Sequence, residues 1–191
     1  SESQRAKYLG RVFQDPMNGT AATMEIEENL ALAFRRGDKR TLRIGITQAE
    51  RKMYREVLAR LGLGLENRMT SKVGLLSGGQ RQALTLLMAT LKKPRLLLLD
   101  EHTAALDPKT AAKVLDATDR IVGEDQLTTL MITHNIRSAL ELGNRTIMMN
   151  NGRIALELAG TERENMTTEQ LLKVFHEQGV SNDRILFSAE S

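Results

Sequence analysis

Cysteine is absent from this 191-residue sequence, and so are long hydrophobic runs. The first absence excludes a disulfide-stabilised fold and any metal site with thiolate ligands, and it suits the reducing cytoplasm. Apolar runs such as residues 96–99 fall far short of the roughly 18 residues that a membrane-spanning helix needs. The opening residues, Ser-Glu-Ser-Gln-Arg, have no apolar stretch behind them. We therefore expect neither a signal peptide nor a membrane-spanning segment.

An excess of one charge is lacking as well. Lysine and arginine number 27 and aspartate and glutamate 24, which gives a net charge of +3 with both signs mixed along the chain. This balance is weak evidence for a nucleic-acid partner. With 41% hydrophobic residues, the chain is long enough for one core domain with a smaller lobe.

The first half of the sequence predicts a strand followed by a small helical lobe. Residues 8–13 form the strand, which ends before Pro16 because proline cannot donate to a sheet ladder. A helix opens at residues 23–28, with carboxylates in its first turn. A second helix is predicted over residues 48–61, where apolar side chains recur at helical spacing before Gly62.

The second half predicts alternating strands and helices. The leucine run at residues 96–99 is typical of a parallel strand covered on both faces, and residues 127–133 repeat that pattern. A helix over residues 108–122, ended by Gly123, joins the two strands. The remaining expectations are a hairpin of residues 146–149 and 153–158 around an Asn-Gly turn, a helix over residues 168–178, and a loosely held tail from residue 181.

Two stretches place polar groups where a phosphate or a metal can bind. Ser77, Gly78, Gly79 and Gln80 precede an apolar helix, and free N–H groups with the helix dipole make an anion site there. An ordinary serine-capped helix after a glycine turn explains the same residues. Asp100-Glu101 ends the leucine run, at the sheet edge where ligands bind: one carboxylate can hold Mg²⁺ and the other can orient or deprotonate water.

Two further polar residues follow predicted strands. His134 ends the second apolar run, where a ring nitrogen can donate to a phosphate oxygen, and Gln14 follows the first strand. Taken singly, His134 is explained by packing or capping, Gln14 carries almost no information, and Asp100-Glu101 can be a helix cap or the start of a solvated loop. Together, four weak signals occur in one order on strand ends that a parallel sheet brings together.

That combination resembles the ATP-binding cassette (ABC) family. Gln14 matches the Q-loop glutamine, residues 76–80 match the signature and residues 96–101 match the Walker B strand with its acidic pair. Asp107 ends a stretch similar to the D-loop, and His134 matches the switch histidine.

The likeness extends from about residue 8 to residue 158. Residues 12–17 look like the importer form of the Q-loop, and the chain is similar to ATPase components of bacterial transport systems, uncharacterised or amino-acid related. The resemblance implies an α/β P-loop NTPase core with a mostly parallel sheet. Residues 1–180 would form a partial ABC ATPase domain, with a helical lobe inserted at about residues 17–92, and residues 181–191 would form a tail.

The resemblance also implies residue roles at an ATP and Mg²⁺ site. Asp100 would bind Mg²⁺, Gln14 would approach the metal and the attacking water, and Glu101 would act as general base. His134 would contact the γ-phosphate. The remaining nucleotide-binding residues that it implies are Ser77, Gly78, Gly79 and Gln80, which would act on ATP held by a partner subunit, and Asp107 of the D-loop.

The function implied is that of the ATP-hydrolysing subunit of a transporter for uptake of a small solute, with amino acids the first candidate. Its partners would be a transmembrane permease, a second ATPase subunit in a head-to-tail dimer and, indirectly, a solute-binding protein, with no nucleic acid. The chain would then lie at the cytoplasmic face of the membrane. Alternatives are a soluble ABC-type ATPase acting on nucleic acid or ribosomes, and a non-catalytic truncated cassette.

Two departures from the family pattern stand out. The phosphate-binding motif Gly-x-x-x-x-Gly-Lys-Ser/Thr occurs nowhere in the sequence, and the family's first strands would precede residue 1 with it. We expect truncation as the simplest account, and negligible ATP hydrolysis by this chain alone. His102 stands where the family usually has proline; either its ring perturbs Glu101 or it is a tolerated loop substitution, and we favour the second.

Overall fold

The computed structural model describes residues 5–38 and 45–177, which form two compact units divided between Met131 and Ile132. Each unit is described separately below. The first contains β1 (Leu9–Val12), η1 (Pro16–Gly19), α2 (Ile26–Phe34), α3 (Gln48–Ala59), η2 (Leu65–Asn67), η3 (Val73–Leu75), α4 (Gly78–Thr90), β2 (Leu96–Asp100), α5 (Pro108–Asp125) and most of β3 (Thr129–Ile132).

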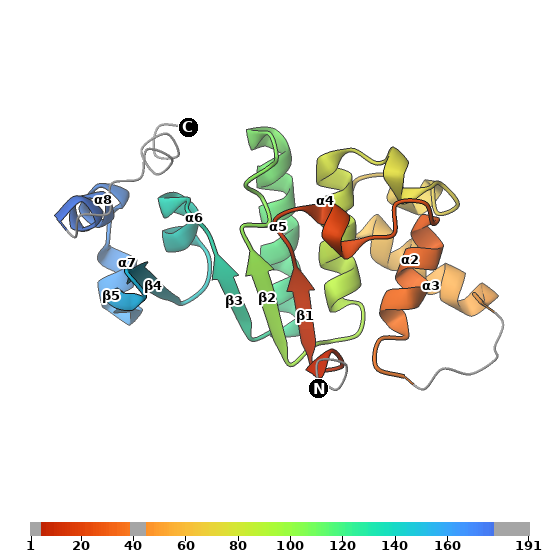
Figure 1. Ribbon diagram of the computed structural model, residues 1–191, viewed down its shortest axis with the longest axis horizontal. Helices are drawn as coiled ribbons and strands as arrows, with labels where there is room; N and C mark the ends of the chain where they lie inside the picture. The colour runs from red at the N-terminus through yellow and green to blue at the C-terminus, as the bar shows by residue number, and fades with distance from the viewer. Residues whose placement is uncertain (1–4, 39–44, 178–191) are drawn as a thin grey trace. The chain divides into compact units, whose positions relative to one another are not determined.

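A three-stranded sheet with the order β1-β2-β3 organises the first unit (Figure 1). β1 and β2 are parallel, in a register that pairs Leu9 with Leu96 and Val12 with Leu99. Leu97 and Leu99 are buried, so the leucine run forms the interior strand that the sequence predicts. Figure 1 shows α5 behind this sheet, and side chains of α5 and β2 share one hydrophobic core.

The prediction that residues 127–133 form a strand covered on both faces is wrong. The strand β3 is present, but its side chains alternate: Met131 packs against the core, whereas Leu130 and Ile132 are each 54% exposed. One face of this strand is therefore covered and the other is not. The apolar residues 130–132 do not distinguish these two cases, because consecutive apolar residues give the same pattern on both faces of a strand.

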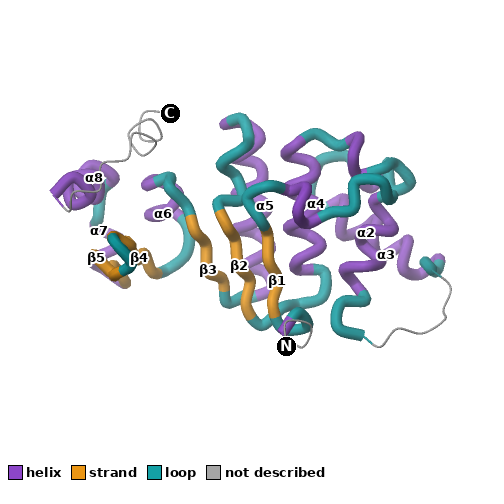
Figure 2. Tube along the Cα trace, viewed as in Figure 1, coloured by secondary structure: helices purple, strands orange, loops and turns teal. Residues whose placement is uncertain are grey.

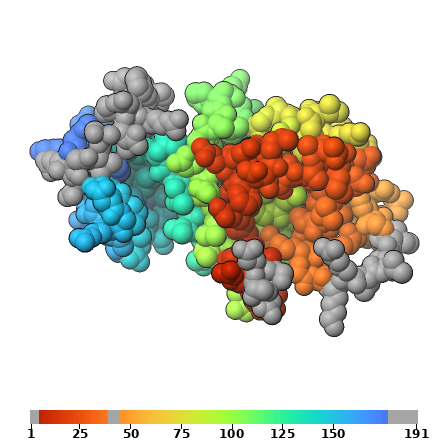
Figure 3. All heavy atoms as spheres, viewed as in Figure 1, coloured from red at the N-terminus to blue at the C-terminus, as the bar shows by residue number. Residues whose placement is uncertain are grey.

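Helix α4 passes close to the sheet and to the chain that follows β1. A Cβ atom on Gly10 would lie 2.6 Å from the carbonyl oxygen of Ala89, and one on Gly19 would lie 2.8 Å from Cγ2 of Thr85. Glycine at these two positions therefore allows close packing against α4. In Figure 1 the red segment after β1 crosses in front of α4, and in Figure 3 the same red segment lies on the face turned to the viewer.

The far end of α4 is held by a side chain from the segment after α2. The guanidinium of Arg36 donates to the carbonyl oxygen of Ala89 at 3.2 and 3.3 Å and to that of Lys92 at 2.9 Å. In return, Nζ of Lys92 donates to the carbonyl of Arg36 at 3.1 Å. Burial lowers the pKa of Arg36. These bonds satisfy carbonyl groups that a helix C-terminus leaves without partners in the helix.

An ion pair joins α2 to α3. Arg51 donates from Nε and Nη2 to the carboxylate of Glu27 at distances of 2.9 to 3.2 Å, and Glu27 is only 3% exposed. A buried carboxylate needs such a partner, because an uncompensated charge in the core is strongly destabilising. The helices also share the apolar core of the sheet. The assignment of residues 17–92 to an inserted lobe stays a prediction.

The second unit holds the predicted hairpin and the predicted last helix (Figure 2). β4 (Arg145–Asn150) pairs with β5 (Arg153–Ala159) across a two-residue turn in which Asn151 and Gly152 both have positive φ, 49° and 74°. This is the backbone that an Asn-Gly hairpin turn adopts. The unit also contains α6 (Ile136–Glu141), α7 (Gly160–Asn165) and α8 (Thr168–Glu177), and the predicted tail from residue 181 lies outside the described residues.

The start of α2 and the end of α5 differ from the sequence prediction, and α3 ends at Ala59, two residues earlier than predicted. α2 begins at Ile26 because Glu25 caps it, together with Glu28 in a reciprocal capping box. α5 continues past Gly123 to Asp125, and the left-handed residue Gln126 (φ 49°) ends it. Glycine lowers helix stability without stopping a helix, so Gly123 alone does not fix the end. No helix in the ranges described is long and apolar enough to span a membrane.

Replacement by alanine should have opposite effects at Gly10, which packs closely against α4, and at Gly123, which has open space around it. Gly10→Ala should lower the free energy of unfolding by about 1–3 kcal/mol, because the nearest obstacle is a backbone oxygen that cannot rotate away. Gly123→Ala, where nothing lies within 4 Å, should raise it by about 0.5–1 kcal/mol. Urea unfolding of the two variants measures both. Unchanged stability of Gly10→Ala would contradict the packing described here.

Candidate functional site

Two predicted site residues meet where β1 and β2 end. Because the strands are parallel and Val12 pairs with Leu99, Gln14 and Glu101 each follow by two residues at the same edge of the sheet. The side-chain amide Nε2 of Gln14 donates to Oε2 of Glu101 at 3.3 Å. The structure thus brings together an amide and a carboxylate that are 87 residues apart in sequence.

Asp100, the other acid of the pair, contacts an arginine that the sequence analysis did not select. Nη2 of Arg11 lies 3.2 Å from Oδ2 of Asp100, and the same guanidinium lies 4.5 Å from the ring centre of Phe13. Both partners are substantially exposed, so the pair contributes little to stability. Its effect is local, since a cation offsets part of the charge of two adjacent carboxylates. A basic residue inside the first predicted strand was the available signal.

The backbone bends sharply at Glu101. Its φ of 42° lies in the left-handed region, which few residues other than glycine adopt, and its carbonyl accepts from the N–H of Ala104 at 3.0 Å. Such conformations carry a cost of about 1–3 kcal/mol and occur preferentially at functional sites. The turn takes the chain away from β2 immediately after the acidic pair.

The ring of His102 packs inward, against α5. It is 2% exposed, and Nε2 lies 3.1 Å from Oγ1 of Thr118. The hydroxyl of Thr118 donates to the carbonyl of Val114 at 2.8 Å, so Nε2 of His102 acts as the donor to Thr118. Burial lowers the pKa of His102 to about 4 and keeps the ring neutral. This packing agrees with a tolerated loop substitution, and an effect of His102 on Glu101 stays untested.

Ser77 and Gln80 cap the N-terminus of α4. Oγ of Ser77 accepts from the N–H of Gln80 at 3.3 Å, and Oε1 of Gln80 accepts from the N–H of Ser77 at 3.2 Å. This is the serine-capped helix of the ordinary structural explanation. It engages neither N–H of the two glycines, which begin the helix, so the helix end keeps donors for an anion.

The two glycines of this segment have different surroundings. Gly78 is exposed, and a Cβ atom there would lie 3.5 Å from Leu106, an ordinary contact. Gly79 is buried, and a Cβ atom there would lie 1.8 Å from Cγ2 of Thr110. Gly79 therefore allows α4 to pack against α5, whatever its N–H binds. A bulky substitution at Gly79 is consequently a poor probe of phosphate binding, because it also disturbs the core.

Asp107 caps α5 beside the start of α4. Its carboxylate accepts from the N–H of Thr110 at 3.0 Å, and hydrogen bonds from the Thr110 side chain and backbone lower its pKa. The neighbouring Leu106 is the residue that faces Gly78. The predicted D-loop thus lies next to the signature of the same chain. Whether Asp107 contacts a nucleotide stays a prediction.

His134 belongs to the second unit. It follows β3 and precedes Asn135, whose side chain caps α6 by accepting from the N–H of Ser138 at 2.9 Å. Its predicted approach to the γ-phosphate, beside the site formed by Gln14 and Glu101, stays a prediction.

The oxygens at the strand edge suit a hard cation. Asp100 and Glu101 supply carboxylates, and with Nε2 of Gln14 turned to Glu101 the amide oxygen is the group left to act as a ligand. Mg²⁺ takes such oxygens from one or two protein residues and fills its remaining positions with water and phosphate. Within the described ranges no group of three or more acidic, histidine or cysteine side chains could enclose a metal alone.

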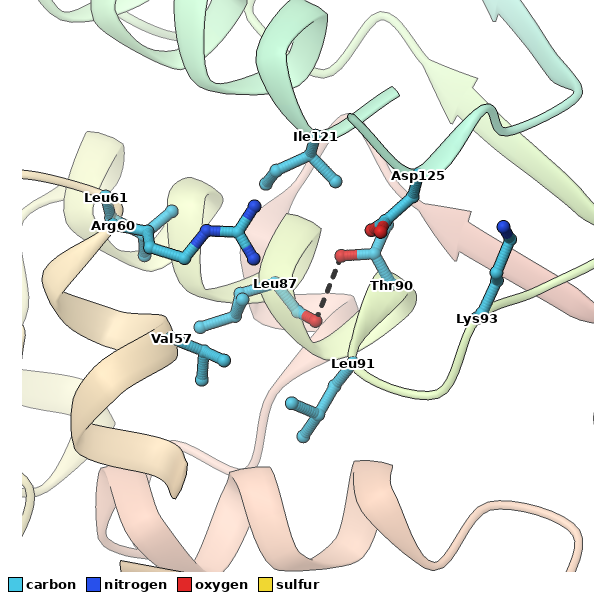
Figure 4. Close-up of a pocket in the computed structure, with 9 residues that line it drawn as sticks. All are labelled: Val57, Arg60, Leu61, Leu87, Thr90, Leu91, Lys93, Ile121 and Asp125. Atoms are coloured by element: carbon cyan, nitrogen blue, oxygen red, sulfur yellow. Dashed lines mark hydrogen bonds between the residues drawn. The ribbon is translucent and has the colours of Figure 1, made fainter. Parts of the chain in front are cut away.

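A cavity of about 210 Å³ lies elsewhere, between α3, α4 and α5 (Figure 4). It is lined by apolar side chains such as Val57, Leu87 and Ile121 and by the charged side chains of Arg60 and Asp125. None of the candidate site residues lines it. This cavity therefore does not contribute to the chemistry at the strand edge.

Comparisons with known sequences agree with this arrangement. A family model described as ABC transporter matches residues 1–104. The tyrosine transport ATP-binding protein of Clostridioides difficile is 44% identical over 175 residues, which cover 92% of this chain and 69% of that protein. The thiamine import ATP-binding protein ThiQ of Salmonella choleraesuis is 35% identical over 147 residues, covering 77% and 58%. The chain thus spans 58–69% of the length of these two relatives.

Solved structures show the same fold. One is a dimeric ATP-binding cassette in a post-hydrolysis state, bound to ADP and Pi. It superposes with a TM-score of 0.67 and 28% sequence identity, and the match covers 83% of this chain and 65% of that chain. CbiO1 of Clostridium perfringens, part of the ABC transporter complex CbiONQ, matches 97% and 68% with a TM-score of 0.69 at 22% identity, which bears on the fold alone. The predicted α/β P-loop NTPase core with a parallel sheet is confirmed.

Packing at Gly79 predicts a rescue. Gly79→Ala should lower the free energy of unfolding by about 1–3 kcal/mol, because its Cβ would overlap Cγ2 of Thr110. Adding Thr110→Ser removes that methyl group, keeps the hydroxyl and should restore most of the loss. Gly78→Ala serves as the control and should change stability by no more than about 0.5 kcal/mol. If the double variant is no more stable than Gly79→Ala, the steric explanation is wrong.

His102 predicts a pH dependence of stability. Its pKa is about 4 in the folded chain and 6.5 ordinarily, so the unfolded chain binds a proton first as pH falls. Stability from the neutral ring is complete above pH 6.5 and about 3 kcal/mol of it is lost between pH 6.5 and 4. His102→Gln should flatten this part of the stability curve. Parallel curves for the wild type and His102→Gln would disprove the assignment.

Proposed function

The chain belongs to the ABC transporter family, and on that premise we propose that it acts as the ATP-binding and ATP-hydrolysing subunit of an importer. The observation that carries this proposal is the contact between Gln14 and Glu101 at the carboxyl ends of two parallel strands. Glu101 offers a carboxylate that can take a proton from water, and Gln14 holds that carboxylate in place through its amide. Little covalent chemistry is asked of the protein beyond this, since phosphoryl transfer is accelerated mainly by positioning and charge.

Asp100 and the amide oxygen of Gln14 would hold Mg²⁺. When bound, the ion neutralises charge on the phosphate oxygens and fixes their position. Arg11 is paired with Asp100 at 3.2 Å, so Mg²⁺ would take the place of this guanidinium at the carboxylate. Asp100 would bind the ion, Gln14 would connect it to the water site, and Glu101 would take the proton from the water.

The N-terminus of α4 would bind phosphate of a nucleotide held mainly by a second cassette. Ser77 and Gly78 are exposed, and the N–H groups of Gly78 and Gly79 begin a helix whose dipole favours an anion. Gln80 would keep this end rigid through the capping box, with Asp107 beside it as the D-loop acid and His134 acting on the γ-phosphate. The dimeric cassette of similar fold supports a head-to-tail pair.

The transported solute is proposed to be an amino acid, with tyrosine the first to test. The support is the 44% identity to a tyrosine transport ATP-binding protein. Passage of the solute would fall to a permease, with a solute-binding protein upstream. The chain would lie at the cytoplasmic face of the membrane, with residues 17–92 as the lobe that contacts the permease. A nucleic-acid partner is not favoured, since charges of both signs are nearly balanced.

The proposal is tested with the full-length product of the gene that encodes this chain, purified with its permease. Glu101→Gln should lower ATP turnover by about 10²-fold or more while ATP affinity changes little, because the variant removes the proton acceptor and keeps the side chain's shape. In cells that lack the system, wild-type genes should restore tyrosine uptake and Glu101→Gln should not.

The control is Glu162→Gln, a substitution on the exposed surface of α7 that should leave turnover and uptake unchanged. Full ATP turnover in Glu101→Gln would remove this residue from its proposed role. If the wild-type protein hydrolyses ATP normally but its genes do not restore tyrosine uptake, the ATPase role stands and the proposed solute is rejected.

A further inference from the structure

A buried glutamine connects α4 to the chain just before Gln14. Gln82 lies one turn after Gly78 on α4 and is 0% exposed. Its side-chain Nε2 donates to the carbonyl oxygen of Phe13 at 3.0 Å, across 69 residues of sequence. Phe13 immediately precedes Gln14, so this bond anchors the backbone at the point where the chain leaves β1.

The side-chain oxygen of Gln82 indicates that this residue does more than fill space in the core. Oε1 of Gln82 is buried and has no hydrogen-bond partner within the part of the chain that the structure describes. A buried acceptor left unsatisfied costs free energy, and methionine would fill a similar volume without that cost. What methionine cannot do is donate to the Phe13 carbonyl. Donation from Nε2 to the Phe13 carbonyl is therefore the interaction that explains a glutamine at this buried position.

The hydrogen bond from Gln82 holds a segment, residues 11–14, whose other contacts include those with β2 and within the segment itself. Val12 is fully buried and pairs with Leu99, and the guanidinium of Arg11 lies over the ring of Phe13. Gln14 itself is exposed, and its amide reaches Glu101 at 3.3 Å. The orientation of the Phe13 peptide group decides the direction in which Gln14 projects, because its carbonyl belongs to the same planar unit as the Gln14 nitrogen.

We propose that Gln82 is a positioning residue for the Gln14–Glu101 pair. By holding the Phe13 carbonyl, it sets the direction of Gln14 toward Glu101 and ties that pair to the helix whose first residues, Ser77 and Gly78, form the anion site. Displacement of α4 along its axis pulls on the Phe13 peptide and moves Gln14 relative to Glu101. This inference rests on the proposed function, in which Gln14 and Glu101 act on water during ATP hydrolysis.

The first experiment observes the pair without requiring activity. In residues 1–191, ¹⁵N–¹H spectra record the side-chain amide of Gln14, assigned by its disappearance in Gln14→Ala. Gln82→Met should move these signals toward those of a glutamine whose side-chain amide donates only to water, and Thr90→Val should not. Thr90 is the matched control because it is a buried polar residue of α4 whose hydroxyl donates to carbonyls of its own helix, those of Leu86 and Leu87. Unmoved Gln14 signals in Gln82→Met would overturn the proposal.

The second experiment is a double-mutant cycle on ATP turnover by the full-length gene product with its permease. Gln82→Met should lower kcat about 10-fold with ATP affinity changed less than twofold, and Thr90→Val should leave kcat unchanged. In a Gln14→Ala background, adding Gln82→Met should have no further effect, since its action passes through Gln14. If Gln82→Met does not fold, Gln82→Asn replaces it, because the amide shortened by one methylene no longer reaches Phe13.

The outcomes separate this inference from the function on which it rests. Suppose that Gln14→Ala and Glu101→Gln each reduce turnover. If Gln82→Met then lowers turnover by the same factor in the wild type and in the Gln14→Ala background, Gln82 is structural and the positioning role is rejected. If neither Gln14→Ala nor Glu101→Gln affects turnover, the proposed function fails first. Loss of turnover in Gln82→Met that disappears in the Gln14→Ala background supports the coupling.

Discussion

The parallel pairing of β1 with β2 is the constraint on which the first unit depends. Its register places Val12 beside Leu99, and two residues later Gln14 beside Glu101. A slip by one residue would turn the buried leucines of β2 to the opposite face and separate the amide from the carboxylate. The same hydrogen-bonded ladder that buries Leu97 and Leu99 therefore sets the position of the polar groups beyond it. Stability and chemistry are linked here through the backbone.

Much of this architecture follows from local patterns. The leucine run, the Asn-Gly turn and the Ser-capped helix each have a physical signature confined to a few residues, and the structure contains all three. The exposed face of β3 could not be predicted in this way, since it depends on which elements pack nearby. Helix ends at Ile26 and Asp125 also depend on caps that single residues do not specify.

The site shows the same division. Gln14, Asp100 and Glu101 follow apolar strands, and that position is visible in the sequence. Arg11 and Gln82 are different, because each matters through one contact with a residue distant along the chain: Arg11 with Asp100 and Gln82 with Phe13. A polar residue inside an apolar strand or helix is the only sequence signal of such a contact. It shows that a partner is needed, but it does not identify the partner.

The hydrogen bonds from Arg36 to the C-terminal carbonyls of α4 change the electrostatic potential at that end of the helix. A helix normally presents positive potential at its N-terminus and negative potential at its C-terminus. Here the guanidinium lies on the C-terminal carbonyls, and arginine keeps its charge even where burial lowers its pKa. Both ends of α4 therefore attract anions at a distance. In the proposed phosphate site, the preference for one end of α4 would come from short-range contacts with the N–H groups of Gly78 and Gly79. The fit of the phosphate to these groups, more than the long-range field, would then set its orientation.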